Sequence, residues 1–402
     1  MARRAPMFRG VKGSKTVFVV RRTLEAAVLC PAILPLALFL VIGRRHVAIV
    51  GRASPVISML VAPLEAHLRT LTAHQRRTWI VLNLSRADNQ FVEDVYRREI
   101  RLFGSQQRFR RRVCWWAALC SRRMVELKEQ KSHTAWSCGT QVVRLAPAEV
   151  RQGEEQLRRL GLDLESPYFC FTSRHQAYYD RLRRAGVVVK SRSIRDPDEA
   201  TYLEASVRIA ARLGIPAVRI GRDLDPLARR STEGGIIDYA GRGRNDLCDV
   251  VLAAHTTFLL NGATGAFWLT EMFHRPQVNG DVYDARHVQL DGSVFTIQRV
   301  RSAHDGRLLT LREMLAHESR YADERYQSSL GLELVRNDVD DLVEASLELQ
   351  QRLSGAWEPS AEDTALQRQY REIVARHSSE PTWMGRGVVS TAFLRKHPDL
   401  LA

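Results

Sequence analysis

The stretch from residue 256 to 281, TTFLLNGATGAFWLTEMFHRPQVNGD, predicts a strand followed by a turn and a helix. Thr256 to Leu260 is a short β-branched, aromatic and aliphatic run of the length expected for a buried strand. Gly262 and Gly265 permit a tight turn. Apolar residues from 266 to 273 then recur at helical spacing after Thr264, a candidate N-cap. The chain is therefore expected to pass from a strand directly into a helix.

The same stretch also predicts a second strand. The helix should stop before Pro276, and Gln277 to Asn279 begin the next strand. Strand, helix and strand in this order form the unit of a parallel sheet. Such a unit places backbone N–H groups and a positive helix end at the carboxyl edge of the sheet, where a phosphate is stabilised. Two glycines can also simply close a turn, so the neighbouring sequence has to distinguish these interpretations.

The composition is typical of a globular protein long enough for two domains. The chain has 402 residues, of which 45% are hydrophobic and 7% are aromatic. Its formal net charge is +15, and nearly all of the positive charge is arginine. The basic residues crowd the first half, including a run from 108 to 112. This distribution indicates an anionic membrane surface or a phosphate-bearing ligand as a partner.

The cysteines indicate a reducing compartment. They contain no C-x-x-C pair, and no histidine stands beside them at metal-ligand spacing. Their positions are Cys30, Cys114, Cys120, Cys138, Cys170 and Cys248. We therefore expect free thiols in the cytosol, without a disulfide framework or a zinc site.

Residues 26–42 form an apolar run without any charge, flanked by arginine pairs at 21–22 and 44–45. As one helix the run reaches only about 25 Å, short of the roughly 30 Å hydrocarbon core of a bilayer. Pro31 and Pro35 also interrupt its backbone hydrogen bonds. We interpret the run as a membrane-embedded or interfacial anchor with both ends in the cytoplasm. A buried helix, a full span and a signal peptide are the alternatives.

The rest of the chain alternates strands with helices, which predicts an α/β fold with parallel sheets. The predicted strands are 46–51, 79–84, 168–172, 217–220, 235–237 and 256–260. The predicted helices are 56–69, 91–103, 108–131, 147–166, 197–213, 246–254, 309–321 and 339–353. We divide the chain into a basic N-terminus with the apolar segment (1–45), two Rossmann-like domains that face one cleft (46–160 and 161–357), and a helical extension (358–402).

Candidate binding residues follow the ends of the predicted strands, at the edge where parallel sheets bind ligands. They are Ser173, Arg174, Ser193, Arg195, Gly221, Arg222, Asp238, Tyr239, Asn261, Gly262, Thr264 and Gly265. An arginine fork holds two phosphate oxygens at once and stays charged at any working pH. A single arginine is more often a solvated surface residue. Its repetition at several strand ends favours a diphosphate pocket, with Arg174 and Arg195 as the main cations.

Several motifs of the chain are characteristic when taken together. They are FTSR (171–174), SIRDPDEATY (193–202), VRIG (218–221), IIDYA (236–240), NDLCDVVLAA (245–254), the Gly-x-x-Gly stretch, RNDVDDLVEASLELQQRLSGAW (336–357) and VVSTAFLRKHPDLL (388–401). With these motifs the chain resembles a family of bacterial glycosyltransferases found among surface-polysaccharide genes. The resemblance covers residues 160–355 and, more loosely, 46–105 and the C-terminal end. Relatives usually have His-Val-Arg-Asp at 172–175 and Ser-x-Arg-Asn at 193–196. Both arginines therefore match, while their neighbours differ.

The resemblance implies a two-domain glycosyltransferase of GT-B-like fold, distantly similar to fucosyltransferases that hold a guanosine-diphosphate sugar. The C-terminal domain would bind a nucleoside-diphosphate sugar, without a metal or other cofactor, and the N-terminal domain would present a glycan or lipid-linked acceptor at the cytoplasmic face of the inner membrane. Arg174 and Arg195 would stabilise the charge of the departing diphosphate. Asp88 and Glu93 are the candidate bases for the acceptor proton. The donor, the acceptor and the stereochemistry stay open.

Three alternatives to this interpretation were considered. The altered motif at 172–175 also fits a nucleotide-sugar-binding or scaffolding subunit at the membrane that catalyses no transfer. The basic segment 108–131 suggests nucleic-acid binding as a further alternative. No nucleic-acid motif accompanies this segment, and we expect no nucleic-acid partner. A nicotinamide-dependent dehydrogenase is disfavoured because the first strand ends at residues 50–52 without a Gly-x-Gly-x-x-Gly turn.

Overall fold

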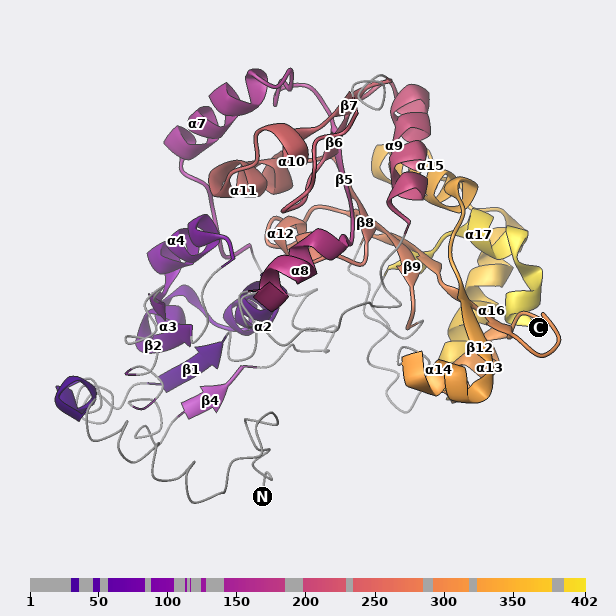
Figure 1. The fold of residues 1–402 in the computed structure, drawn as a ribbon, viewed down its shortest axis with the longest axis horizontal. Coiled ribbons are helices and arrows are strands. Elements are labelled where there is room, and N and C mark those ends of the chain that lie inside the picture. The colour runs from indigo at the N-terminus through magenta and orange to yellow at the C-terminus, as the bar shows by residue number, and fades with distance from the viewer. Residues whose placement is uncertain are drawn as a thin grey trace.

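A computed structural model shows an α/β protein built on two parallel sheets (Figure 1). It describes residues 30–35, 46–50, 57–83, 88–104, 113, 116, 124–127, 141–184, 198–228, 234–284, 292–317, 324–377 and 387–402. We call the part up to residue 127 the N-terminal lobe and the part from residue 147 the C-terminal lobe.

The N-terminal lobe contains a four-stranded sheet with the order β3-β2-β1-β4. All of its pairings are parallel. Its elements are β1 (His46–Val50), α2 (Ser58–Arg69), α3 (Ala73–Thr78), β2 (Trp79–Asn83), α4 (Gln90–Glu99), β3 (Arg101–Gly104) and β4 (Met124–Glu126). The central position of β1 explains its apolar sequence, because helices and neighbouring strands enclose it.

The C-terminal lobe contains a seven-stranded parallel sheet with the order β7-β6-β5-β8-β9-β10-β13. Its elements up to β10 are α7 (Pro147–Arg158), β5 (Phe169–Ser173), α8 (Gln176–Arg184), α9 (Glu199–Leu213), β6 (Ala217–Arg219), β7 (Ile236–Ile237), α10 (Tyr239–Arg242), α11 (Asp246–His255), β8 (Leu259–Gly262), α12 (Ala266–Glu271), β9 (Gln277–Val282) and β10 (Val294–Ile297). Counted within the lobe, the order is 3-2-1-4-5-6-7, the order of a doubly wound Rossmann sheet. It reverses between β5 and β8, the place where such sheets form a crevice at their carboxyl edge.

The remaining elements follow β10 in the chain. They are β11 (Arg299–Ser302), α13 (Leu311–Ala316), α14 (Glu324–Leu330), β12 (Leu332–Val335), α15 (Val339–Ser354), α16 (Ala361–His377), β13 (Val388–Val389), α17 (Thr391–Lys396) and the 3-10 helix η4 (Pro398–Leu401). β11 and β12 form a separate antiparallel ribbon. The segment 358–402, predicted as a helical extension, also supplies a strand, since β13 pairs in parallel with β10.

Side chains of the seven-stranded sheet alternate between two buried layers. Phe169 and Phe171 of β5 pack in the cluster with α9 and α15, whereas Cys170 between them packs in the cluster with α11 and α7. Successive side chains of a strand point to opposite faces, and helices cover both faces here (Figure 1). Because both faces of β5 are buried, its sequence is a continuous apolar run.

The two lobes share one core. Val250 of α11 and Met272 after α12 are buried in the same cluster as Val92 of α4. A buried ion pair crosses the same interface, with Arg69 Nη1 2.9 Å from Glu271 Oε1. Arg69 Nη2 also donates to the Glu271 carbonyl at 2.7 Å. The hollow predicted between the domains is therefore a cavity beside a packed interface.

Two predicted helices of the first half are wrong in part. Helix 91–103 ends at Glu99, because Ile100 is extended (φ −141°, ψ 163°) and Arg101–Gly104 pairs with β2. Within the predicted helix 108–131, Met124–Glu126 is instead strand β4 beside β1. Most other residues of that segment lie outside the described part of the chain. Short strands depend on partners that are distant in sequence, which helical spacing does not reveal.

The 256–281 stretch also differs in detail from its prediction. β8 begins three residues later than expected because Thr256 caps α11, and its Oγ1 accepts from Cys170 N at 3.0 Å. In the following turn the left-handed residue is Ala263 (φ 55°). Gly265 has right-handed helical angles (φ −69°, ψ −12°). The turn therefore places an alanine in a conformation that favours glycine.

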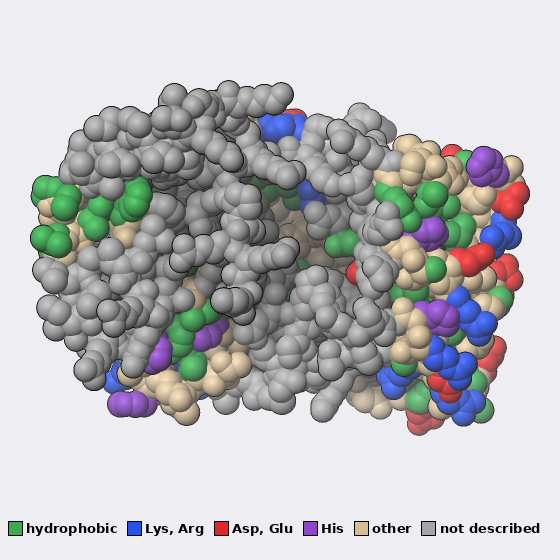
Figure 2. Space-filling model, turned by 90° about the horizontal axis from the view of Figure 1, so that it is seen from below, with side chains coloured by type: hydrophobic (Ala, Val, Ile, Leu, Met, Phe, Trp, Pro, Cys, Tyr) green, Lys and Arg blue, Asp and Glu red, His purple; other side chains and the backbone are tan. Residues whose placement is uncertain are grey.

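The predicted anchor at 26–42 is described only at residues 30–35, which form a short helix with Leu34 55% exposed. Figure 2 shows apolar side chains gathered at the end of the molecule where this helix lies in Figure 1. Among the residues that the structure describes, no helix combines the length and apolar character needed to cross a bilayer. The rest of the run lies outside those residues, so the anchor stays a prediction.

Candidate functional site

A cavity of about 130 Å³ lies at the carboxyl edge of the seven-stranded sheet, where the strand order reverses. Its walls come from the loops after β5, β6 and β8, from α8 and α11, and from the start of α4 in the N-terminal lobe. The charged and polar residues that line it include Asp88, Asn89, Thr172, Ser173, Arg174, His175, Tyr178, Tyr179, Arg222, Arg244, Asp249 and Thr264. A cavity of roughly 150 Å³ holds a benzene-sized molecule. The space therefore takes one group of a larger ligand in this conformation.

Three arginines reach the cavity from separate parts of the C-terminal lobe. Arg174 follows β5, Arg222 lies in the loop after β6, and Arg244 precedes α11. Parallel strands end at the same edge of a sheet, so residues far apart in sequence meet there. Three guanidinium groups around one small space favour a ligand with more than one negative charge.

Arg174 is held beside the turn after β8. Its backbone N–H donates to the Gly262 carbonyl at 3.2 Å, which extends the pairing of β5 with β8 past the end of the strand. Its guanidinium carbon lies 3.9 Å from the centroid of the Tyr179 ring. This cation–π contact orients the plane of the guanidinium group.

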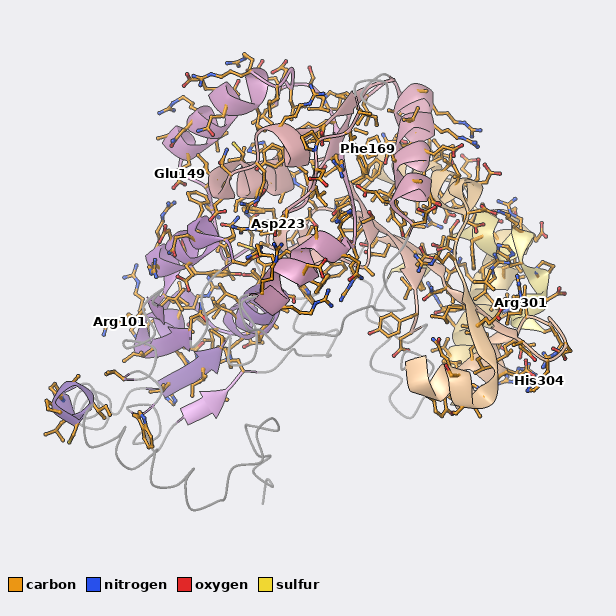
Figure 3. All side chains as sticks on the ribbon, viewed as in Figure 1. Arg101, Glu149, Phe169, Asp223, Arg301 and His304 are labelled. Carbon is orange, nitrogen blue, oxygen red and sulfur yellow. The ribbon has the colours of Figure 1, made fainter. Side chains whose placement is uncertain are left out.

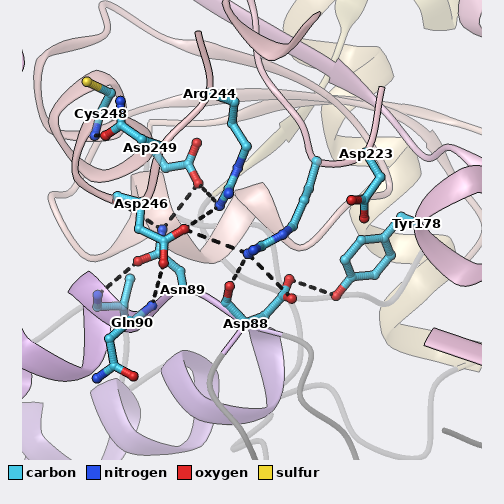
Figure 4. Close-up of polar contacts among 12 residues, drawn as sticks. Asp88, Asn89, Gln90, Tyr178, Asp223, Arg244, Asp246, Cys248 and Asp249 are labelled. Atoms are coloured by element: carbon cyan, nitrogen blue, oxygen red, sulfur yellow. Dashed lines mark hydrogen bonds and ion pairs between the residues drawn. The ribbon is translucent and has the colours of Figure 1, made fainter. Parts of the chain in front are cut away.

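Asp88 of the N-terminal lobe is held by two arginines and a tyrosine of the C-terminal lobe. Figure 4 shows its contact with Tyr178. Its Oδ1 lies 2.9 Å from Arg181 Nη2 and 3.5 Å from Arg222 Nη1. Arg222 Nη1 also donates to the Asp88 backbone carbonyl. Tyr178 donates to Asp88 Oδ2 at 3.0 Å, and burial together with this carboxylate raises the pKa of Tyr178.

The loop after β6 presents Arg222 through an unusual backbone. Gly221 has φ 152° and Asp223 has φ 58°. The angle requires glycine, and a Cβ at Gly221 would also lie 2.7 Å from Leu224 Cδ1, so that side chain would have to shift. Asp223 lies where the two lobes meet (Figure 3) and accepts from Arg181 Nε. The loop thus supplies one cation to the cavity and anchors a second one.

A second group of contacts joins α4 to α11 (Figure 4). Gln90 N donates to Asp246 Oδ2 at 2.8 Å, and Asn89 Nδ2 donates to Asp249 Oδ2 at 3.2 Å. Arg244 Nη2 lies 2.8 Å from Asp246 Oδ1 and 2.5 Å from Asp249 Oδ2. Burial raises the pKa of Asp249 to about 6, although Arg244 opposes the shift. Asp249 thus accepts from both Asn89 and Arg244 in a buried position between the lobes.

His175 has both ring nitrogens engaged. Its Nδ1 accepts from the Ala177 backbone N–H at 3.3 Å, and its Nε2 lies 3.3 Å from Glu199 Oε2. This arrangement places the ring proton on Nε2 and makes the imidazole a cap for α8. Glu199 is shared with Arg219 of β6. His175 would have to turn away from these partners before it could accept a proton from a substrate.

The turn from 261 to 265 uses its own polar groups internally. Asn261 Oδ1 accepts from Thr264 N at 3.1 Å and from Thr264 Oγ1 at 2.9 Å. Ala266 N donates to Thr264 Oγ1 at 3.3 Å. The helix that follows, α12, has only six residues, so the charge at its N-terminus is small. The arginines, more than this helix end, can balance the charge of a phosphate.

No family model matches the chain, and no curated protein is significantly similar to it. Among solved structures, a glycosyl transferase family 9 protein from Veillonella parvula DSM 2008 is 10% identical, with a TM-score of 0.33 over 58% of this chain and 80% of that one. The iron-containing dodecameric glycosyltransferase TibC from enterotoxigenic E. coli H10407 is 14% identical, with a TM-score of 0.32 over 60% of this chain and 59% of that one. The E. coli heptosyltransferase WaaC with ADP-2-deoxy-2-fluoro heptose is 12% identical, with a TM-score of 0.24 over 72% of each chain. Scores in this range do not establish the function of this protein.

Seven of the residues predicted for the site line the cavity. They are Asp88, Ser173, Arg174, Gly221, Arg222, Thr264 and Gly265. Asn261 and Gly262 do not line the cavity. The Asn261 amide donates to Asn279 of β9 at 3.0 Å. Ser193 and Arg195 lie outside the described residues, so the role of Arg195 stays a prediction.

Three other predicted residues do not line the cavity and have structural partners instead. Glu93 is buried in α4, where it accepts from Asn83, Gln90 and Arg97. Asp238 is buried beside Arg219 at 3.1 Å and accepts from Gly241 N at the start of α10. Tyr239 donates to Asp249 at 2.8 Å and so supports a residue of the wall.

Sequence reasoning missed Asn89, Tyr178, Arg181, Arg244 and Asp249. Tyr178 and Arg181 belong to α8, a helix after β5 that the sequence pattern does not predict. Asp249 falls within the predicted helix 246–254 but is not among the predicted site residues. The available signal was Asn245, which caps α11 by accepting from Cys248 N at 2.9 Å. An arginine directly before an N-cap lies beside a helix N-terminus, which in a parallel sheet lies at the ligand edge.

Proposed function

We propose that this protein transfers a sugar from a nucleoside-diphosphate donor to an acceptor hydroxyl. The observation that carries the proposal is the convergence of Arg174, Arg222 and Arg244 on one cavity at the switch point of a Rossmann sheet. Cleavage of the anomeric C–O bond leaves a diphosphate with additional negative charge. Guanidinium groups already in place stabilise that charge without reorganisation, which lowers the barrier. The arginines can do this without a bound metal, and metal-independent transfer is part of the proposal.

The N-terminal lobe supplies the acceptor side in this proposal. Of the two candidate bases, Asp88 lines the cavity and Glu93 does not. The Asp88 carboxylate accepts from Arg181 and Tyr178, and Arg222 lies beside it. It would have to lose at least one of these contacts before it could take the acceptor proton. We therefore propose that the Asp88 carboxylate releases at least one of these contacts during the reaction cycle.

A donor screen by thermal shift tests this function. One nucleoside diphosphate or its sugar should raise the melting temperature, because a ligand that binds only the folded state stabilises it. Arg174→Ala should abolish the shift. Arg159→Ala is the matched control, since Arg159 is 71% exposed near the end of α7 and does not line the cavity. A shift that survives Arg174→Ala and Arg222→Ala together would refute the proposed site.

The second candidate function is a nucleotide-sugar-binding or scaffolding subunit without turnover. The observation that favours it is the engagement of both nitrogens of His175 and of both oxygens of Asp88. These groups, as placed, offer no ready base to an acceptor. Release of nucleoside diphosphate from the donor that gives the thermal shift separates the two functions. Binding without release, across a panel of glycan and lipid-linked acceptors, would favour the scaffold.

We also propose that the protein acts in surface-polysaccharide biosynthesis at the cytoplasmic face of the inner membrane. The support is the apolar run 26–42, with Leu34 exposed, and the basic residues around it. Such a segment binds anionic bilayers through apolar burial and charge together. The full chain should co-sediment with vesicles that contain an anionic lipid, and Ile33→Asp with Leu34→Asp should prevent this. Equal co-sedimentation of the double variant would contradict the membrane assignment.

A further inference from the structure

We infer that Arg181 and Arg222 form the diphosphate-binding pair of the site, and that Asp88 occupies this pair as an internal anion which the ligand displaces. The inference rests on the proposed function and deepens it. It adds Arg181, which sequence reasoning missed, and it gives Asp88 a role in which its charge opposes ligand binding.

The contacts of Asp88 are those of a bound anion. Its carboxylate accepts from Arg181 Nη2 at 2.9 Å and from Tyr178 at 3.0 Å, with Arg222 Nη1 at 3.5 Å. These three donors come from α8 and the loop after β6, whereas Asp88 comes from the other lobe. Guanidinium groups bind carboxylate and phosphate oxygens with the same geometry. A terminal phosphate can therefore use the same donors.

Two features indicate that the pair is built for an anion. Arg181 is anchored by Asp223, whose left-handed backbone (φ 58°) follows the required glycine at 221. Backbone strain of this kind gathers at ligand sites, where the surrounding structure holds it. Arg222 and Tyr178 line the cavity together with Asp88. Arg222 and Tyr178 are therefore directed to the ligand space, and Arg181 adjoins it through its contact with Asp88.

The remaining lobe contacts do not depend on Asp88. Gln90 N and Asn89 Nδ2 bind Asp246 and Asp249, and the buried Arg69–Glu271 pair joins the lobes elsewhere. Displacement of one carboxylate can therefore enlarge the cavity without separating the lobes. A second negative charge cannot remain beside a bound diphosphate without strong repulsion, so the ligand and the Asp88 carboxylate compete for the pair.

Calorimetric titration of inorganic pyrophosphate at fixed ionic strength tests the inference on the full chain. Asp88→Asn removes the charge but leaves an oxygen for Tyr178, and it should tighten pyrophosphate binding by about fivefold. Tyr178→Phe removes the hydrogen bond to Asp88 and should tighten pyrophosphate binding by less than Asp88→Asn does. Arg181→Gln and Arg222→Gln should each weaken binding by about tenfold.

The matched control is Asp94→Asn, which removes one negative charge from α4, the helix that follows Asp88. Asp94 is 47% exposed, pairs with Arg97 and lies outside the cavity wall. Its substitution should change pyrophosphate affinity by less than about twofold, because solvent and salt screen exposed charges. An equal gain in Asp94→Asn and Asp88→Asn would show a general charge effect and overturn the inference.

The outcomes separate this inference from the proposed function. If Arg222→Gln weakens binding but Asp88→Asn leaves it unchanged or weaker, Asp88 does not compete and the inference fails, while the nucleotide site stands. If Asp88→Asn binds pyrophosphate tightly and the unaltered protein binds it weakly, the inference holds. If neither protein binds pyrophosphate and no nucleoside diphosphate shifts the melting temperature, both proposals fail.

Discussion

At the scale of single residues, the backbone of the turn after β8 shows how a site can store strain. Ala263 has φ 55°, a region that residues with a Cβ adopt at a cost, and it lies between the strand end at Gly262 and the cavity-lining Thr264. The adjacent glycine at 265 does not use its conformational freedom. The position of the left-handed residue in this turn was therefore not evident from the glycine pattern.

Ala263→Gly should stabilise the protein or leave its stability unchanged, with a gain of up to about 1 kcal/mol. Glycine relieves the left-handed strain, and this gain offsets the larger conformational entropy of the unfolded chain. Ala148→Gly in the first turn of α7 is the matched control and should lose about 0.5 to 1 kcal/mol. Urea denaturation of the two variants gives the comparison. Equal destabilisation by both substitutions would mean that position 263 is not strained.

The buried Asp281 connects stability to pH. It has φ 53°, accepts from Asn337 N at 2.7 Å and from Tyr202 at 3.2 Å, and burial raises its pKa from 3.8 to about 6. A carboxyl group whose pKa is higher in the folded state favours folding when it is protonated. Its contribution is present below about pH 4 and is lost as the pH rises through about 6.

Asp281→Asn should remove this loss, because asparagine tolerates the left-handed angles and does not ionise. The stability of the variant relative to the unaltered protein should rise between pH 4 and pH 6, by on the order of 2 kcal/mol. Urea denaturation across this range measures the difference. Asp340→Asn, on the exposed face of α15, is the control. A difference that is constant with pH would show that Asp281 does not titrate in this range.

At the scale of elements, helix caps explain which helices the sequence predicted well. Asp198, Asn245 and Asp338 each accept a backbone N–H in the first turn of α9, α11 and α15. These three helices begin within two residues of their predicted starts. A cap is a local interaction between neighbours in sequence, so its signal does not depend on the rest of the fold.

Asp338→Ala should destabilise the protein by about 1 kcal/mol through loss of the cap on α15. Asp338 accepts from Asp341 N at 2.9 Å and also binds Lys396, which links α15 to α17. Asp340→Ala in the same turn removes only an exposed pair with Arg208 and should cost a few tenths of a kcal/mol. Thermal unfolding of the two variants tests this order. A larger loss in Asp340→Ala would contradict the capping role.

At the scale of the whole molecule, the shared core predicts that the lobes unfold together. Arg69 is fully buried between Glu65 of its own helix and Glu271 of the other lobe. Burial raises the pKa of Glu65, and Arg69 lowers it in part. The arginine therefore pairs with two buried carboxylates, one from each lobe, and both lobes depend on it.

Arg69→Met should cost about 3 to 5 kcal/mol, because it leaves buried acids without their cation. Unfolding followed by circular dichroism and by tryptophan fluorescence should remain one transition that shifts as a whole. Arg208→Met removes exposed pairs on α9 and should cost less than about 1 kcal/mol. Two separate transitions, of which only one responds to Arg69→Met, would show that the lobes fold independently.

The sequence by itself determined the α/β class, the parallel strands β5 to β9 of the C-terminal lobe and the capped helices between them. Apolar runs, helix caps and turn residues act between positions that are close in sequence. They can therefore be recognised without knowledge of the tertiary structure. It also determined that Arg174 and Arg222 follow strands, and strand ends of a parallel sheet meet at one edge.

Only the tertiary structure decided where short strands form and which charges meet. β3, β4 and β13 depend on partners elsewhere in the chain, and their few residues have no periodicity of their own. The contacts of Asp88 with Arg181 and of Asp249 with Asn89 join residues from different lobes. Such pairs form because packing of the two lobes brings them together. Their energies depend on burial and distance, which a linear pattern of residues does not contain.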